Sequence, residues 1–140
     1  QDLLDEANKI NKKKWFMNIF YHNFLKKKMT KKYDGVYMLD VLEHISKIQE
    51  TKFLKNIISS LNANGILVVG IPSLEFQKYS RPIRVSGHIN CKTSKNLKKT
   101  LENFFYNVVI FSMNDEIVHT GFEKMSCYLF AMCFNKKKTK

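Results

Sequence analysis

The chain has 140 residues, with 44% apolar and 26% charged residues, as is typical of a globular protein with one domain. Its apolar runs fall far short of the roughly 20 residues that a membrane-spanning helix needs. No signal peptide is visible at the start, so we expect a cytoplasmic location and no membrane partner. The net charge of +12 comes from scattered lysine clusters without aromatic interleaving, and nucleic acid is therefore a disfavoured partner.

In chain order, the first predicted element is a helix over Leu3–Lys14, where apolar residues recur at helical spacing. The next apolar stretch, Trp15–Phe20, predicts a strand. A basic linker over Lys26–Lys32 separates it from a second apolar run, Val36–Leu39, which is typical of a buried strand. Asp40 follows where this strand should end, and a helical pattern begins directly after it.

The second half of the chain alternates between helical and strand patterns. A helix is predicted over Gln49–Leu61 and stopped by Asn62–Gly65, and another is predicted to begin with Ser94 as its cap. The stretch from Ser73 to Asn90 has no period, which is typical of a functional loop. Strands are predicted over Ile66–Ile71, Val108–Phe111 and Met125–Phe134, and the first of these is apolar throughout, like a parallel strand buried on both faces.

Four segments together resemble one known family. YDGVYMLDVLEHI (Tyr33–Ile45) is similar to the fourth-strand motif of class I S-adenosylmethionine-dependent methyltransferases, and GILVVGIPS (Gly65–Ser73) is similar to their fifth-strand motif. GHIN (Gly87–Asn90) and FSMNDEIVHTGF (Phe111–Phe122) resemble the later part of one branch. The resemblance covers about residues 3–134. It implies an α/β fold with a partial Rossmann-like methyltransferase sheet, mostly parallel with an antiparallel last strand between two others, and helices on both faces.

The glycine-rich first motif of this family, D-x-G-x-G-x-G, is absent, because no two of the five glycines lie within four residues of each other. We therefore interpret residues 1–134 as an incomplete methyltransferase domain and residues 135–140 as a disordered basic tail. The absent first strand would lie at the centre of the sheet, so its loss leaves one edge of Val36–Leu39 unpaired. We expect either Trp15–Phe20 or another chain to pair with this edge, which makes self-association an open alternative.

The resemblance also implies a site for S-adenosyl-L-methionine. In open α/β sheets ligands bind beyond the carboxyl ends of the strands. Leu39 and Asp40 are accordingly expected beside the cofactor, with His44 nearby. Asn23 is a candidate donor to the adenine, although a loop role fits it as well. Glu43 also fits a surface carboxylate stabilised by a helix dipole.

His88 and His119 are the candidate general bases for the methyl acceptor, because histidine titrates near neutral pH. Asp115 could orient one of them, and it would meet His119 only if the connection is turn-like or helical. A loop-stabilising role fits each of these residues equally. Metal binding is a weaker alternative, because no pair shows metal-ligand spacing such as HxxxH.

The resemblance implies methyl transfer from S-adenosyl-L-methionine to a small-molecule or glycan-type acceptor in the intact domain. We expect the isolated chain to be weak or inactive, because the first-strand loop supplies much of the cofactor site. The alternative is a non-catalytic interaction subunit or pseudoenzyme that pairs through its exposed sheet edge. A basic nucleic-acid-binding module is a third and less favoured alternative, which steep salt dependence of RNA binding would support.

Overall fold

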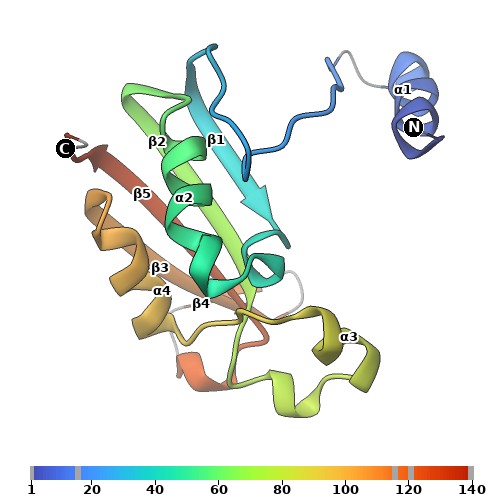
Figure 1. The fold of residues 1–140 in the computed structure, drawn as a ribbon. Helices are drawn as coiled ribbons and strands as arrows, with labels where there is room; N and C mark the ends of the chain where they lie inside the picture. Colours follow the sequence, from blue (N-terminus) through green and yellow to red (C-terminus); the bar gives the residue numbers. More distant parts are fainter. Residues whose placement is uncertain (1, 15–16, 115–116, 120–121, 139–140) are drawn as a thin grey trace.

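The computed structural model describes residues 2–14, 17–114, 117–119 and 122–138 (Figure 1). Its centre is a five-stranded sheet in the order β1-β2-β5-β3-β4. Helices and strands alternate over the first half of the chain, and two further α-helices then precede the last three strands. The strands are β1 (Tyr33–Leu39), β2 (Leu61–Pro72), β3 (Phe105–Asn114), β4 (Ile117–His119) and β5 (Tyr128–Lys136), and the helices are α1 (Asp2–Lys14), α2 (Lys47–Ile58), α3 (Pro82–Gly87) and α4 (Ser94–Glu102).

The sheet has the predicted mixed topology. β1 and β2 pair in parallel, and β5 pairs antiparallel with both β2 and β3. β3 therefore runs in the same direction as β1 and β2, and the last strand lies between two others, as predicted. β5 can occupy this inner position because its residues are apolar on both faces as far as Phe134, so neither face needs water.

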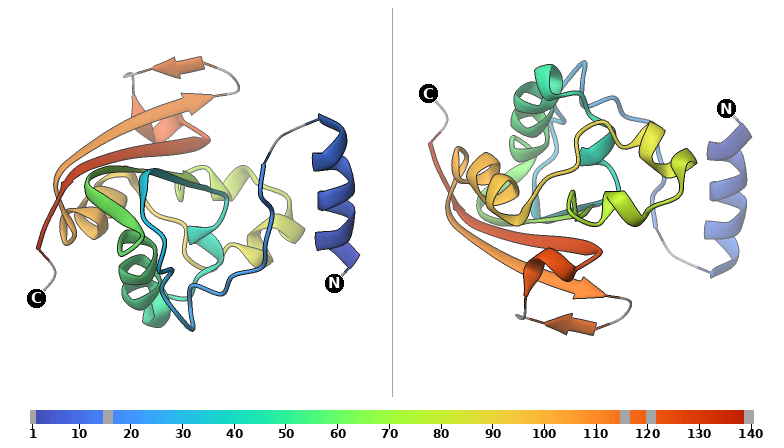
Figure 2. Two further views of the ribbon diagram at one scale, coloured as in Figure 1. Left: turned by 90° about the horizontal axis from the view of Figure 1, so that it is seen from above. Right: turned by 90° about the horizontal axis from the view of Figure 1, so that it is seen from below.

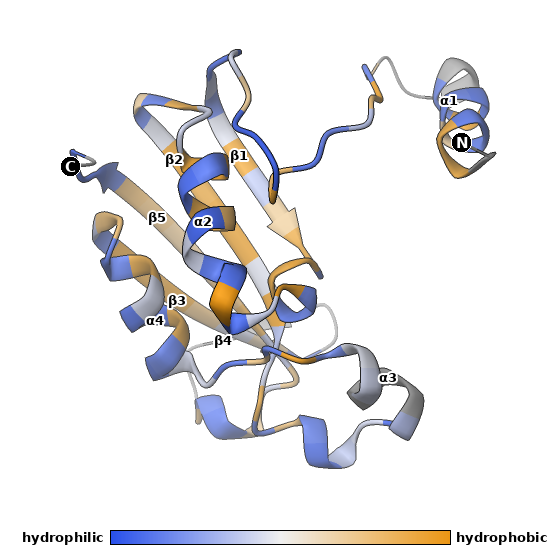
Figure 3. Cartoon of the chain, viewed as in Figure 1, coloured by the Kyte–Doolittle hydropathy of each residue, from blue (hydrophilic) through white to orange (hydrophobic). Residues whose placement is uncertain are grey.

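One core cluster joins the helices to a single face of the sheet. Alternate residues of the strands point to this face, and α2 and α4 contribute their apolar stripes to the same cluster. Among the described residues, α2 and α4 thus pack on one face of the sheet (Figures 1 and 3). The expectation of helices on both faces is met on this face. The opposite face carries Val68, Phe111, Phe130 and Met132.

The edge of β1 is unpaired in the described chain, because β1 stands at the end of the strand order. The predicted strand over Trp15–Phe20 is wrong for residues 17–20, which form no strand, while residues 15 and 16 lie outside the described residues. A strand needs a ladder partner, and this segment does not pair with β1. The predicted first helix is present as α1, which stands apart from the sheet (Figure 2).

Several predicted boundaries shift for local reasons. Asn62–Gly65 does not stop α2 but forms a bulge within β2, since Tyr33 pairs with Leu61 and Gly35 with Ile66. Thr93 rather than Ser94 caps α4, because its side chain accepts a hydrogen bond from the Asn96 amide at 3.2 Å. β5 continues to Lys136, so the first residues of the predicted tail belong to the sheet.

No described helix is long and apolar enough to cross a membrane. The cytoplasmic location stays a prediction from the sequence.

Candidate functional site at the strand ends

Three strands place their ends at one edge of the sheet. β1 and β2 are parallel, so their carboxyl ends at Leu39 and Pro72 point the same way. β5 is antiparallel to β2 and starts where β2 finishes, with Tyr128 opposite Pro72. The topology therefore brings a residue from the last strand to the position where ligands bind in open α/β sheets.

Asp40 turns the chain sharply at this edge. Its φ of 53° lies in the left-handed region, which is rare for a residue other than glycine. Its amide donates to the Gly70 carbonyl at 3.1 Å, which holds it to the end of β2. Burial raises the pKa of Tyr128, and so does the hydrogen bond between its hydroxyl and the Asp40 side chain. Asp40 is thus held by hydrogen bonds to both β2 and β5.

Glu43 lies in a short 3₁₀ turn, Leu42–His44, directly after this bend. Its side chain is 0% exposed, and neither carboxylate oxygen has a hydrogen-bond partner among the described residues. The interpretation of Glu43 as a surface carboxylate is therefore wrong. Burial raises its pKa above the usual value, and the nearby negative charge of Asp40 adds to the effect.

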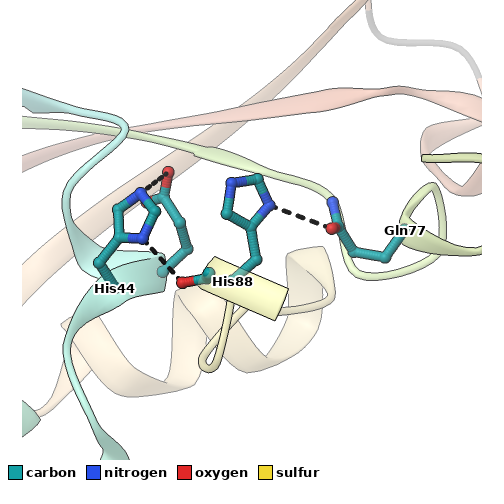
Figure 4. Close-up of polar contacts among 5 residues, drawn as sticks. His44, Gln77 and His88 are labelled. Carbon is teal, nitrogen blue, oxygen red and sulfur yellow. Dashed lines mark hydrogen bonds and ion pairs between the residues drawn. The ribbon is translucent and has the colours of Figure 1, made fainter. Parts of the chain in front are cut away.

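The GHIN segment folds back over this turn and brings His88 next to His44 (Figure 4). The ring centroids lie 5.2 Å apart in an edge-to-face arrangement. His44 Nδ1 is 2.8 Å from the Gly87 carbonyl oxygen, and His88 Nδ1 is 3.1 Å from Gln77 Oε1. The Asn90 amide donates to the Glu43 carbonyl at 2.9 Å. Two segments far apart in the sequence are thus fixed to each other.

A polar network between GHIN and α2 also holds the GHIN segment in place. Asn90 is 1% exposed and donates from Nδ2 to Glu50 Oε2 at 2.7 Å. Lys92 Nζ forms an ion pair with the same carboxylate at 2.7 Å and also donates to Asn90 Oδ1 at 3.2 Å. Because a buried lysine is tolerated only when paired, its ion pair with the partly buried Glu50 ties GHIN to α2.

Two cavities meet at the strand ends. A groove of about 620 Å³ runs beside β1 and has mostly apolar walls, including Phe24, Met38 and Leu39. Asn23 also lines it, in a loop that Asn56 Nδ2 fixes by donating to the Phe24 carbonyl at 2.6 Å. A more polar pocket of about 430 Å³ lies beyond β1 and β2. It is lined by Asp40, Glu43, His44, Pro72, Phe76, Gln77, Ser80, His88, Cys127 and Tyr128.

The predicted cofactor residues fall into these two cavities. Leu39 and Asn23 share the groove, and Asp40 and His44 line the pocket next to it. Asn23 Oδ1 accepts the Leu25 amide at 2.9 Å, so the loop role also holds for this residue. Its Nδ2 remains the donor end of the side chain.

The fold separates the predicted catalytic residues His88 and His119. His88 lies in the pocket, whereas His119 lies in β4, on the far side of β5 and β3. At a strand spacing of about 4.8 Å, β4 is roughly 14 Å from β2. The backbone of His119 is extended and pairs with Ser112. Asp115 lies outside the described residues.

Sequence reasoning did not identify Tyr128, Gln77 or the Asn90 network as part of the site. Tyr128 could have been found from the antiparallel placement of the last strand, since this puts its first residue beside Pro72. Gln77 carries no local signal, because it reaches His88 from a short 3₁₀ turn in the irregular segment.

No protein-family model matches the chain, and no curated protein matches it in sequence. Solved structures do match in fold. A SAM-dependent methyltransferase from Thermotoga maritima, described as a possible histamine N-methyltransferase, matches with a TM-score of 0.70 at 14% identity, over 94% of this chain and 70% of that one. The N-methyltransferase NodS from Bradyrhizobium japonicum WM9, in complex with S-adenosyl-L-homocysteine, matches with a TM-score of 0.63 at 16% identity, over 94% and 60%.

DhpI in its complex with SAM and HEP matches with a TM-score of 0.65 at 12% identity, over 94% of this chain and 63% of that one. This chain therefore spans about two thirds of the length of these structures. At such low identity the similarity shows the fold alone. The fold is that of the class I SAM-dependent methyltransferases, as the resemblance implied.

Proposed function

We propose that this chain forms part of a methyltransferase domain that transfers a methyl group from S-adenosyl-L-methionine to a small-molecule or glycan-type acceptor. The observation that carries the proposal is the meeting of an apolar groove and a polar pocket at the carboxyl ends of β1 and β2. The junction between them is the Leu39–Asp40 bend. A methyl transfer needs two ligands held end to end, and this junction suits them.

The groove fits the adenosine part of the cofactor. Its volume of about 620 Å³ is in the range of small-molecule sites, which are mostly apolar with a few polar groups. Leu39 would contact the adenosine, Asn23 Nδ2 would donate to the base, and Asp40 and His44 would lie at the end nearer the pocket. When bound, the cofactor supplies the methyl group from its sulfonium. The described chain offers no glycine-rich loop for the methionine part, so we expect weak binding.

The pocket fits the acceptor. Its polar walls include His88 and Tyr128, whose side chains can orient a hydroxyl or amine by hydrogen bonds. His88 is fixed by Gln77, so it can hold an acceptor in one position. Roles for His119 and Asp115 stay predictions from the sequence.

Isothermal titration calorimetry of this chain with S-adenosylhomocysteine tests the proposal. We expect a dissociation constant on the order of 0.1 mM. Asp40→Ala should weaken binding at least about tenfold, which corresponds to roughly 1.4 kcal/mol. Asp34→Ala is the matched control, since Asp34 is an exposed carboxylate near the start of β1, whereas Asp40 follows its end. No heat of binding up to millimolar ligand would contradict the claim that this chain itself holds the cofactor.

The second candidate is a non-catalytic interaction subunit that pairs through β1. The unpaired edge of this strand and the 73% exposure of Tyr37 favour it. Sedimentation velocity should then show concentration-dependent dimers that Tyr37→Lys abolishes, because a lysine on an edge strand opposes pairing. Tyr79→Lys is the control, since Tyr79 is equally exposed but lies in a 3₁₀ turn. A monomer at all concentrations would contradict this candidate.

A further inference from the structure

We propose that Glu43, His44 and His88 bind a divalent transition-metal ion of the Mn²⁺ to Zn²⁺ series. The three side chains each offer a ligand atom, and these atoms lie within 4.8 Å of one another. Nitrogen and oxygen ligands bind Zn²⁺ at about 2.0–2.2 Å, so the cluster needs only a small closure. His44 can move to close the cluster, because its side chain is 48% exposed.

Glu43 gives the independent reason to place a cation here. Its carboxylate is fully buried, and neither oxygen has a hydrogen-bond partner among the described residues. Burying a carboxylate without partners is costly, and the cost is relieved by protonation, by pairing with a cationic side chain or by metal coordination. The two histidines are the groups that line the same space, with His44 Nε2 3.8 Å from Glu43 Oε1.

The hydrogen bonds of the two rings prepare them as ligands (Figure 4). Nδ1 of His44 faces the Gly87 carbonyl oxygen, and Nδ1 of His88 faces Gln77 Oε1. A carbonyl oxygen only accepts, so each Nδ1 carries a proton, and in the neutral imidazole each Nε2 then holds the lone pair. Metal-binding histidines usually donate their other ring N–H to such an oxygen. In Figure 4 the second ring nitrogen of His88 lies on the side that faces His44.

The ligand set decides the class of ion. Two imidazoles and one carboxylate suit Zn²⁺ and its neighbours, whereas Ca²⁺ and Mg²⁺ prefer oxygen ligands alone. Three protein ligands leave at least one coordination position open. The three ligands line the same pocket as Asp40, Gln77 and Tyr128, so an oxygen or nitrogen atom of an acceptor could occupy that position.

This inference goes beyond the proposed function and does not depend on it. It gives His88 the role of a metal ligand instead of a general base, because an Nε2 that binds an ion is not available to accept a proton. It also differs from an ion pair between protonated His44 and Glu43, which would use the same two atoms without an ion. A metal titration separates these arrangements without any methyl donor or acceptor.

The test is a titration of the untagged, chelator-treated chain with Co²⁺, followed by visible absorption. We expect one Co²⁺ per chain, with an intense spectrum of four- or five-fold coordination that Zn²⁺ removes by displacement. His44→Ala and His88→Ala should each weaken binding by more than tenfold. Gln77→Leu should weaken it by roughly 10-fold or more through loss of the hydrogen bond that orients His88.

His22→Ala is the matched control, because His22 lies outside the cluster and contacts the Lys27 carbonyl and the Phe24 ring. It should bind Co²⁺ like the unmodified chain. Circular dichroism melting identifies any variant that fails to fold, and exposed His44 gives a variant that should fold. Absence of a stoichiometric site would overturn the proposal, as would equal binding by the unmodified chain and the folded His44→Ala variant.

Discussion

The groove and the pocket lie side by side at the strand ends, yet they are built in different ways. The pocket is closed by contacts between distant segments, since GHIN is held to the Leu42–His44 turn and, through Asn90 and Lys92, to Glu50. The groove has one wall on β1, whose outer edge no described strand covers. The pocket is thus closed by contacts within the described chain, whereas the shape of the groove depends on what covers β1.

The largest effect should come from breaking the network beneath the pocket. Lys92→Met removes the cation paired with Glu50 and leaves this partly buried carboxylate with Asn90 alone. Loss of one partner from a buried ion pair costs about 3 kcal/mol, measured as the free energy of unfolding in urea. Lys95→Met, at an exposed position of α4, should change it by less than about 0.5 kcal/mol. Equal effects for the two variants would mean that the network does not brace the pocket.

A smaller effect should come from crowding the junction between the two cavities. A Cβ on Gly70 would lie 2.7 Å from Leu39 Cδ2 and 2.8 Å from the Tyr128 hydroxyl. Gly70→Ala should therefore cost about 2 kcal/mol of unfolding free energy, because the packed side chains must move. Gly35→Ala is the control, as nothing lies within 4 Å of its Cβ position. A neutral Gly70→Ala variant would show that the junction adapts freely.

A third effect should come from the backbone conformation at Asp40. Comparing two variants at this position separates backbone strain from the loss of the carboxylate. With φ at 53°, Asp40→Gly should be about 1 kcal/mol more stable than Asp40→Ala, because glycine tolerates the left-handed region. Both variants lose the carboxylate that hydrogen-bonds Tyr128, so thermal unfolding of the pair measures the backbone alone. If Asp40→Ala were the more stable variant, the bend would not be left-handed in solution.

The smallest effect on stability should come from the groove itself. Leu39 is 42% exposed, so Leu39→Ala should lower the free energy of unfolding by only about 0.5 kcal/mol. The same variant should weaken S-adenosylhomocysteine binding several-fold in calorimetry. Leu74→Ala, at a similarly exposed leucine outside the groove, should leave binding unchanged. A loss of stability above about 2 kcal/mol would show that the groove wall is part of the core.

The fold could be predicted well where local patterns and motifs agree. The apolar run around Val36–Leu39 and the continuous run before Phe134 both became strands, and their order follows the resemblance. The strand expected over Trp15–Phe20 failed for residues 17–20, because an apolar run becomes a strand only beside a partner. Sequence reasoning offered His119 as a candidate base, whereas in the fold it lies in a short strand paired with β3.

The candidate site was predicted in part. Asp40 and His44 were found because the motif places them directly after a strand, and His88 because histidine suits proton transfer. Their grouping could not be derived, because His44 and His88 are 43 residues apart with no ligand spacing between them. Glu43 looked like a surface carboxylate, whereas in the fold it is buried and GHIN is hydrogen-bonded to its backbone.

The sequence by itself determined the class of fold and the residues that follow the central strand, because short-range periodicity and motif order depend on neighbouring residues. Only the tertiary structure decided that Glu43, His44 and His88 meet around one space. It also decided that Tyr128 stands beside Asp40, since an antiparallel last strand must begin where its parallel neighbour ends. Contacts of this kind arise from burial and chain reversal, which no local pattern encodes.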